Sequence, residues 1–182
     1  MPDEYIDILN EDLTVFKTCL KSEAHKHGYL HASVHVWFYT DKRELLFQKR
    51  GAYKIAFPNL WDVSVAGHIS AGETAINSAI RETEEEIGLT ITKKALKKIG
   101  SFKKIHQHRK DFIDNEIHLI YIGRLPIPLN PLKIQEEELS AIKLTPIDTF
   151  KKELKKTDFH KRYVSHSNEY YTFVLNEISN NL

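Results

Sequence analysis

A chain of 182 residues is long enough to bury one hydrophobic core and short for two, so we expect a single domain. Its 26 basic and 25 acidic residues leave a formal net charge of +1, which argues against a nucleic acid polymer or an anionic membrane as partner. The single cysteine, Cys19, excludes an intramolecular disulfide, and neither a signal peptide nor an apolar run of roughly 20 residues is present, so we expect a cytoplasmic protein.

The first predicted elements are a helix and a pair of strands. Residues 1–29 are mixed in character and form an amino-terminal extension, in which we expect one helix over Leu13–Lys26. The segment Ala32–Tyr39 is rich in β-branched and aromatic residues and predicts a strand. It should turn back into a second strand, Glu44–Lys49, to make a hairpin.

The middle of the chain predicts a strand, a loop and a helix in succession. Alternating apolar residues favour a strand over Trp61–Ala66, followed by a loop over 67–72. A helix should begin near Thr74 and end at Gly88, because glycine is favoured just past a helix end.

The remaining elements make the chain an α/β domain, because strands and helices are interleaved. The carboxy-terminal part, residues 147–182, should be a helical cover, either over the pocket or in a homodimer interface. The later segments are expected strands at Ile99–Phe102, Glu116–Ile122 and Leu139–Leu144, an irregular connection marked by Pro126, Pro128 and Pro131, and expected helices at Ile147–Lys156 and Tyr170–Ile178.

The helix that ends at Gly88 carries an acidic face. At about 100° per residue, Glu82, Glu85 and Glu86 share that face, beside an apolar stripe that would face the core. Like charges at these spacings repel by roughly a few tenths of a kcal/mol per pair. Because Mg²⁺ is commonly held by carboxylates together with substrate phosphates, the pattern indicates a metal site. The plain alternative is a solvated acidic helix.

The wider spacing around this helix favours the metal site. The Nudix box reads Gly-x5-Glu-x7-Arg-Glu-U-x-Glu-Glu-x-Gly-U, where U is a bulky aliphatic residue. Only Thr83, at the first U position, departs from it, and the chain therefore resembles the Nudix hydrolase superfamily. The matching positions are Gly67, Glu73, Arg81, Glu82, Glu85, Glu86, Gly88 and Leu89.

The resemblance implies a Nudix-type α/β/α sandwich with a mixed central sheet on which the box helix packs. It implies hydrolysis of the diphosphate linkage of a nucleoside diphosphate derivative or a similar small diphosphate. The implied cofactor is Mg²⁺ or Mn²⁺, and the implied site residues are the ligands Glu82, Glu85, Glu86 and the Gly67 carbonyl, with Arg81 pairing with a helix glutamate or Glu73 to orient them.

Beyond the box, the chain resembles the Nudix subgroup related to type I isopentenyl diphosphate isomerase. That isomerase has a cysteine immediately before the Gly-His pair that starts its box, whereas this chain has Ala66 at that position. In the isomerase the glutamates of the box helix are only partly retained, whereas in this chain the set is nearly complete. Both departures favour hydrolysis over isomerisation. The resemblance is carried by His31–Trp37, Leu45–Arg50, Lys54, Trp61–His68 and Asp114–Glu116.

This second resemblance adds four candidates. His31 and His68 match positions where the isomerase holds its own metal, and His68 is also a candidate for substrate binding. Glu116 matches an acidic ligand and should lie toward the box helix, as a second metal ligand or general base, with Asp114 as the alternate. The plainer alternatives are a structural histidine and an exposed strand glutamate.

Lys49, Arg50 and Lys54 form a local basic cluster, and the resemblance places Arg50 and Lys54 near the diphosphate. Simple surface charge is the alternative. Selectivity for the organic group should depend on loops outside the box, chiefly residues 102–116 and 124–136. Three functions therefore remain open: a pyrophosphohydrolase, an isomerase-like protein, and a nucleotide-sensing module without catalysis.

Overall fold

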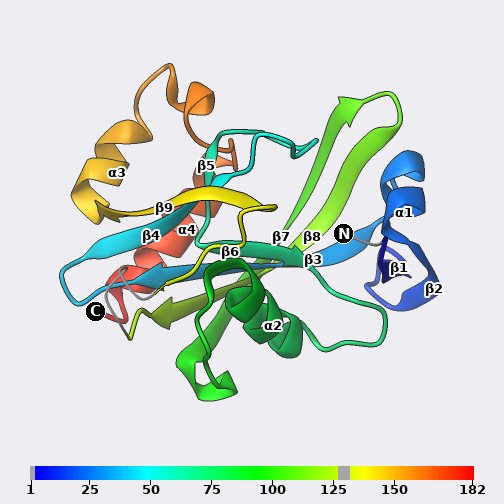
Figure 1. Ribbon diagram of the computed structural model, residues 1–182, viewed down its shortest axis with the longest axis horizontal. Helices are drawn as coiled ribbons and strands as arrows, with labels where there is room; N and C mark the ends of the chain where they lie inside the picture. The colour runs from blue at the N-terminus through cyan, green and yellow to red at the C-terminus, as the bar shows by residue number, and fades with distance from the viewer. Residues whose placement is uncertain (1–2, 127–131) are drawn as a thin grey trace.

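The computed structural model describes residues 3–126 and 132–182, so that Pro128 and Pro131 of the expected irregular connection lie outside the described residues. The described residues contain a nine-stranded mixed sheet and four α-helices (Figure 1). The strands are β1 (Tyr5–Leu9), β2 (Val15–Leu20), β3 (His31–Tyr39), β4 (Glu44–Arg50), β5 (Trp61–Asp62), β6 (Val65–His68), β7 (Leu96–Arg109), β8 (Phe112–Arg124) and β9 (Leu139–Pro146); the helices are α1 (Lys21–His27), α2 (Ala75–Ile87), α3 (Ile147–Glu153) and α4 (Asn168–Ser179).

Strand β3 is the centre of the sheet. It pairs in parallel with β8 and antiparallel with β1, β4 and β6. Its side chains alternate between two cores. Val34 and Val36 belong to the core beneath α2, whereas Trp37 belongs to the core beneath α3 and α4. Helices therefore cover both faces, as Figure 1 shows, and the predicted α/β/α arrangement with a mixed sheet is confirmed.

The predicted helix over Leu13–Lys26 is wrong in its first half. Residues Val15–Leu20 form β2, which pairs with β1, and only Lys21–His27 is helical. The apolar residues of this segment also fit helical spacing, but β-branched and aromatic side chains are favoured on a pleated surface. Pairing with β1 makes the segment a strand and not a helix, and residues 5–9 carry no clear strand pattern in the sequence.

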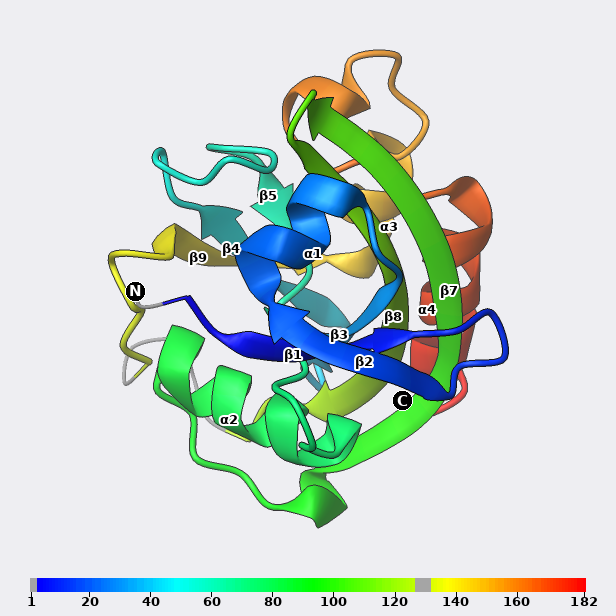
Figure 2. The same cartoon turned by 90° about the vertical axis from the view of Figure 1, so that its right-hand side faces the viewer.

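The segment 102–116 is not a loop, contrary to expectation. Strand β7 extends to Arg109 and pairs with β8 down to the pair Arg109 and Phe112. Figure 2 shows β7 as a long curved strand with β8 running beside it, next to α1. The hydrogen-bonded ladder therefore holds residues 114–118 rigidly, and the short strand that Ile99–Phe102 suggested is only the middle of β7.

The other expected elements are confirmed within a few residues. The hairpin of β3 and β4 is present, Trp61–Ala66 is divided between β5 and β6, and α3 ends at Glu153 instead of Lys156. Gly67 and His68 lie in β6 and not in a loop. No helix in the described ranges is long and apolar enough to cross a membrane.

Gly88 ends α2 in the left-handed conformation, with φ of 66°. A Cβ there would lie 3.1 Å from the carbonyl oxygen of Lys133. Because left-handed backbone costs a residue with a side chain about 1–2 kcal/mol, Gly88→Ala should lower the free energy of unfolding by at least that amount. Denaturant titration measures it.

Gly72→Ala is the matched control. Gly72 has φ of 73°, and a Cβ there would meet nothing within 4 Å. This variant should show the backbone cost alone. Equal losses in the two variants would mean that the approach of Lys133 contributes nothing.

Candidate active site

Three neighbouring strands and one helix bring the candidate residues together. In the sheet, Val34 of β3 pairs with Gly67 of β6, and the next pair is Ser33 and His68. Since side chains alternate along a strand, Gly67 faces α2 and His68 faces the opposite side. Along β8, Glu116 is in register with His31. Strand β6 thus lies between two groups of side chains that could hold a metal ion, one on each face of the sheet.

The first group is formed by the carboxylates of α2. A Cβ on Gly67 would lie 2.0 Å from the Glu82 carboxyl carbon, so only glycine leaves room for this side chain. Glu86 accepts a hydrogen bond of 3.1 Å from the backbone N–H of Ala66 and is 4% exposed. The helix therefore presses two carboxylates against the start of the box.

Burial makes these two glutamates hard to ionise. It raises the pKa of Glu82 to about 7, although the neighbouring Arg81 acts in the opposite direction. It also raises the pKa of Glu86 well above its usual value, and the negative charge of Glu82 adds to the effect. Two buried carboxylates in this state are suited to a cation that favours their charged forms.

Arg81 holds the acidic side chains in place. Its guanidinium donates to Glu73 at 3.1 Å, to Glu82 at 2.8 Å and to Glu85 at 3.0 Å. It also donates to the carbonyl oxygen of His68 at 3.2 Å. The pairing expected from the sequence is thus present with all three glutamates. Glu85 is the most exposed of them, with 51% of its side chain accessible.

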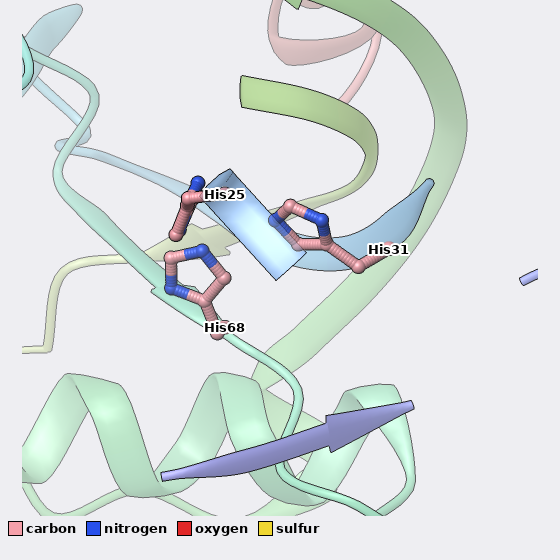
Figure 3. A group of neighbouring side chains, drawn as sticks. All are labelled: His25, His31 and His68. Carbon is pink, nitrogen blue, oxygen red and sulfur yellow. The ribbon is translucent and has the colours of Figure 1, made fainter. Parts of the chain in front are cut away.

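The second group is a histidine centre, defined here as His25, His31 and His68. They come from α1, β3 and β6, and one nitrogen of each ring lies within 4.8 Å of the other two. Figure 3 shows the three imidazoles facing one another. Glu116 adds a carboxylate, with Oε1 3.8 Å from His31 Nε2 and 3.7 Å from His68 Nε2.

The hydrogen bonds of the histidine centre suit a bound metal. His31 Nδ1 lies 2.8 Å from the Tyr29 carbonyl oxygen and donates to it, so Nε2 is the nitrogen that faces Glu116 and would bind an ion. Burial alone would lower the pKa of His31, but its interactions with Glu116 raise it above the usual value, so an ion at Nε2 competes with a proton. Within the described residues, neither this Nε2 nor the Nε2 of His68 has a hydrogen-bond partner. Burial lowers the pKa of His68 well below its usual value, so its imidazole is neutral. Neutral imidazole is the form that binds metals.

Two acidic residues surround the histidine centre. Burial alone would raise the pKa of Glu116, but hydrogen bonds with His118 and His31 bring it well below its usual range. Asp114 lies between His25, at 3.1 Å, and His108, at 2.7 Å, and can orient both rings. The ionic contacts of Glu116 are with His31, His68 and His118, and its side chain lines the same cavity as Glu86 of the box helix.

His25 was missed by the reasoning from sequence. It was placed inside a long helix, where one histidine gives no signal. The actual turn from β2 into the short α1 brings its ring against β8, where it stacks on Phe112 with ring centroids 4.4 Å apart. Only the pairing of β1 with β2 would have indicated that His25 lies at the site.

A cavity of about 400 Å³ joins the two groups. Arg50 and Lys54 line it, but both already have carboxylate partners, Asp62 and Glu138 respectively. The predicted site residues that do not line it are His31, Arg81, Glu82 and Glu85. The predicted site residues that line the cavity are Arg50, Lys54, Gly67, His68, Glu86, Asp114 and Glu116.

Comparison with known proteins identifies the family of the chain. Residues 29–166 match the sequence profile described as NUDIX domain, so the chain belongs to the Nudix family. It is similar to Nudix hydrolase 3 of Arabidopsis thaliana, with 39% identity over 165 residues, 87% of this chain but only 21% of that protein. It is also similar to an isopentenyl-diphosphate Δ-isomerase of an Enterobacter species, with 29% identity over 75% of this chain and 73% of that protein.

Solved structures show the same fold. A crystal structure of a protein from Deinococcus radiodurans superimposes with a TM-score of 0.67 at 20% sequence identity, over 87% of this chain and 96% of that chain. At this level of identity the likeness concerns the fold alone.

Proposed function

We propose that the protein is a metal-dependent hydrolase that cleaves the diphosphate linkage of a small organic diphosphate, such as a nucleoside diphosphate derivative. The observation that carries the proposal is the pair of buried carboxylates, Glu82 and Glu86, held against the backbone of Ala66 and Gly67. Such a pair is costly without a cation. It also adjoins a cavity lined by cationic side chains.

In this proposal, Mg²⁺ or Mn²⁺ is held by Glu82, Glu85, Glu86 and the carbonyl of Gly67. A divalent ion there would neutralise negative charge on the phosphate oxygens and would lower the pKa of a bound water. Arg81 fixes the directions of the carboxylates. Since Arg81 also bonds to the carbonyl of His68, it ties α2 to β6 at the point where Gly67 faces the helix.

The substrate's phosphates are assigned to the cationic wall of the cavity. Arg50 suits bidentate contacts with phosphate oxygens, and Lys54 acts as a point charge. Their carboxylate partners, Asp62 and Glu138, keep both side chains in place before substrate binds. Glu116 is ionised, faces the same cavity and remains our candidate for the general base.

The histidine centre is proposed as a second metal site; if it holds an ion, Glu116 serves as its carboxylate ligand and not as the general base. Imidazole nitrogen suits transition metals more than it suits Mg²⁺, so this site should prefer Mn²⁺ or Zn²⁺. Whether an ion there is structural or takes part in hydrolysis depends on its distance from the bound phosphates.

An isomerase-like activity is the second candidate, and the histidine centre is the observation that favours it. The isomerases to which the chain is similar share 27–29% identity with it. Against it stands Ala66, at the position where the isomerase resemblance calls for a catalytic cysteine: a methyl group cannot transfer a proton. A nucleotide-sensing role without catalysis is the third candidate.

One panel separates these functions. The purified protein is incubated with Mg²⁺ or Mn²⁺ and a set of nucleoside and prenyl diphosphates, and products are followed by ³¹P NMR and chromatography. We expect cleavage of a diphosphate and no conversion of isopentenyl diphosphate into its allylic isomer. Isomer formation would support the second candidate, and tight binding without any cleavage would support the third.

A further inference from the structure

Lys104 differs from the other basic side chains of the cavity because it has no carboxylate partner. The lysine and arginine side chains that line the cavity are Lys21, Arg50, Lys54 and Lys104. Lys21 pairs with Glu4 at 2.6 Å, and Arg50 and Lys54 pair with the two carboxylates named above. Among the residues that the structure describes, Lys104 forms no ion pair. Its positive charge is therefore the one among them that no neighbouring carboxylate balances.

The strand pairing directs Lys104 into the cavity. Lys104 of β7 is in register with Glu116 of β8, so the two side chains stand on the same face of the sheet. Burial alternates along this part of β7: Phe102, Lys104 and His106 are half-buried, whereas the residues between them are exposed. A lysine on the outer face would keep its charge in water, so the inward position of Lys104 needs a physical reason.

Two contacts fix the position of the ammonium group and leave it accessible. Nζ of Lys104 donates a hydrogen bond of 2.6 Å to the carbonyl oxygen of Ser165, and this contact is open to solvent. Nζ also lies 5.4 Å from the centroid of the Phe57 ring, within the range of a cation–π interaction. An ammonium group carries three N–H donors, so two of them remain for a ligand. The chain thus holds a positive charge at the cavity wall with donors to spare.

The surroundings of Lys104 oppose its charged form. Burial lowers the pKa of Lys104, and the negative charges of Asp62, Glu116 and Asp114, which act in the opposite direction, do not restore its usual value. A half-buried ammonium without a counter-ion has a free-energy cost that an apolar side chain of similar length would not have. An anionic ligand in the cavity would offset this cost.

We propose that Lys104 binds an anionic group of the substrate and is the cation of the cavity whose charge is free for this purpose. The inference rests on the proposed hydrolase function only in taking this anion to be a phosphate group. Arg50 and Lys54 can still donate hydrogen bonds to phosphate oxygens, but each shares its charge with a carboxylate. Lysine suits the role because its ammonium is a compact point charge on a flexible stem.

Calorimetric titration with inorganic pyrophosphate, in the absence of divalent metal, tests this binding without any need for turnover. We expect Lys104→Met to raise the Kd by at least about tenfold, because a hydrogen bond to a charged group contributes this much to affinity. Lys98→Met, at an exposed position of the same strand, is the control and should keep the wild-type Kd. An unchanged Kd in Lys104→Met, or no binding by the wild type, would overturn the inference.

Two further results separate loss of charge from damage to the fold. Lys104→Met should have the same melting temperature as the wild type or a higher one, because a half-buried charge is removed. Lys104→Arg keeps the charge and should recover most of the lost affinity for pyrophosphate. An arginine variant that binds as weakly as the methionine variant would show that the charge is not what binds, which contradicts the inference.

Reductive methylation of the wild type, measured by peptide mass spectrometry, gives a test that needs no substitution. Pyrophosphate should slow the methylation of Lys104 severalfold and leave that of the exposed Lys98 unchanged. Equal rates for Lys104 with and without pyrophosphate would contradict a contact between the two.

Kinetics with the best diphosphate of the panel shows whether the contact serves binding or catalysis. Lys104→Met should raise KM by at least about tenfold and leave kcat nearly unchanged, as expected when the ground state and the transition state lose the same contact. A fall in kcat without a rise in KM would contradict a binding role. If no diphosphate is cleaved, the hydrolase proposal fails, and the pyrophosphate titration still decides the role of Lys104.

Discussion

Replacing Glu86 by glutamine should lower kcat by at least about a hundredfold, because charge stabilisation by a bound metal contributes several kcal/mol to such reactions. The side chain is 4% exposed and lines the cavity, so the substitution removes a negative charge at the cavity wall itself. Steady-state hydrolysis of the best substrate from the panel measures the loss.

The same variant should not lose stability in the absence of metal. Burial raises the pKa of Glu86 well above its usual value, so its ionised form opposes folding at neutral pH, and glutamine removes that cost. Added Mg²⁺ should raise the melting temperature of the wild type, since an ion that binds only the folded state stabilises it, and should do so much less in the variant.

Glu84→Gln is the matched control on the same helix. Glu84 is exposed, and its carboxylate accepts a hydrogen bond of 3.1 Å from Thr90 at the surface. Its variant should keep nearly full activity and the full response to Mg²⁺. If both variants lost the same activity, a general effect of charge on α2 would explain the result, and Glu86 would not be a specific ligand.

Replacing His31 by asparagine should remove one equivalent of tightly bound Mn²⁺ or Zn²⁺, with affinity falling by at least about tenfold to a hundredfold. Asparagine is chosen because its amide N–H can keep the hydrogen bond that His31 Nδ1 makes to Tyr29, while the metal-facing nitrogen is lost. Metal content after dialysis, measured by mass spectrometry, and calorimetric titration give the answer.

His27→Asn serves as its control, because this histidine is exposed on α1 next to the centre. It should retain the metal. Loss of Glu116, as Glu116→Gln, should weaken the same site, since the carboxylate lies within 4 Å of two of the rings. Full metal content in His31→Asn would contradict the histidine centre as a metal site.

The sequence predicted the acidic half of the site well. The glutamates of α2 follow from helical periodicity, which depends on residues close in the chain, and Gly88 ends the helix as expected. Gly67 was indicated only by its match to the Nudix box; the structure shows that the carboxyl group of Glu82 occupies the space that a side chain at this position would need.

The positions of the residues in the histidine centre depend on strand pairing, so the sequence indicated only two of its three histidines. His31 and His68 were found by resemblance, but the register of β3 with β6 and β8 sets their distances to Glu116. His25 required the β1 and β2 pairing, which local propensity does not reveal.

The central claim is that water attacks phosphorus at the glutamates of α2. The most direct measurement is hydrolysis of the preferred diphosphate in water enriched in oxygen-18, followed by ³¹P NMR, with wild type and Glu86→Gln compared with and without Mg²⁺. We predict that one phosphate product of the wild type carries the label, only when Mg²⁺ is present, and that the variant forms almost none. Label-free products, or equal labelled product from the variant, would contradict the account.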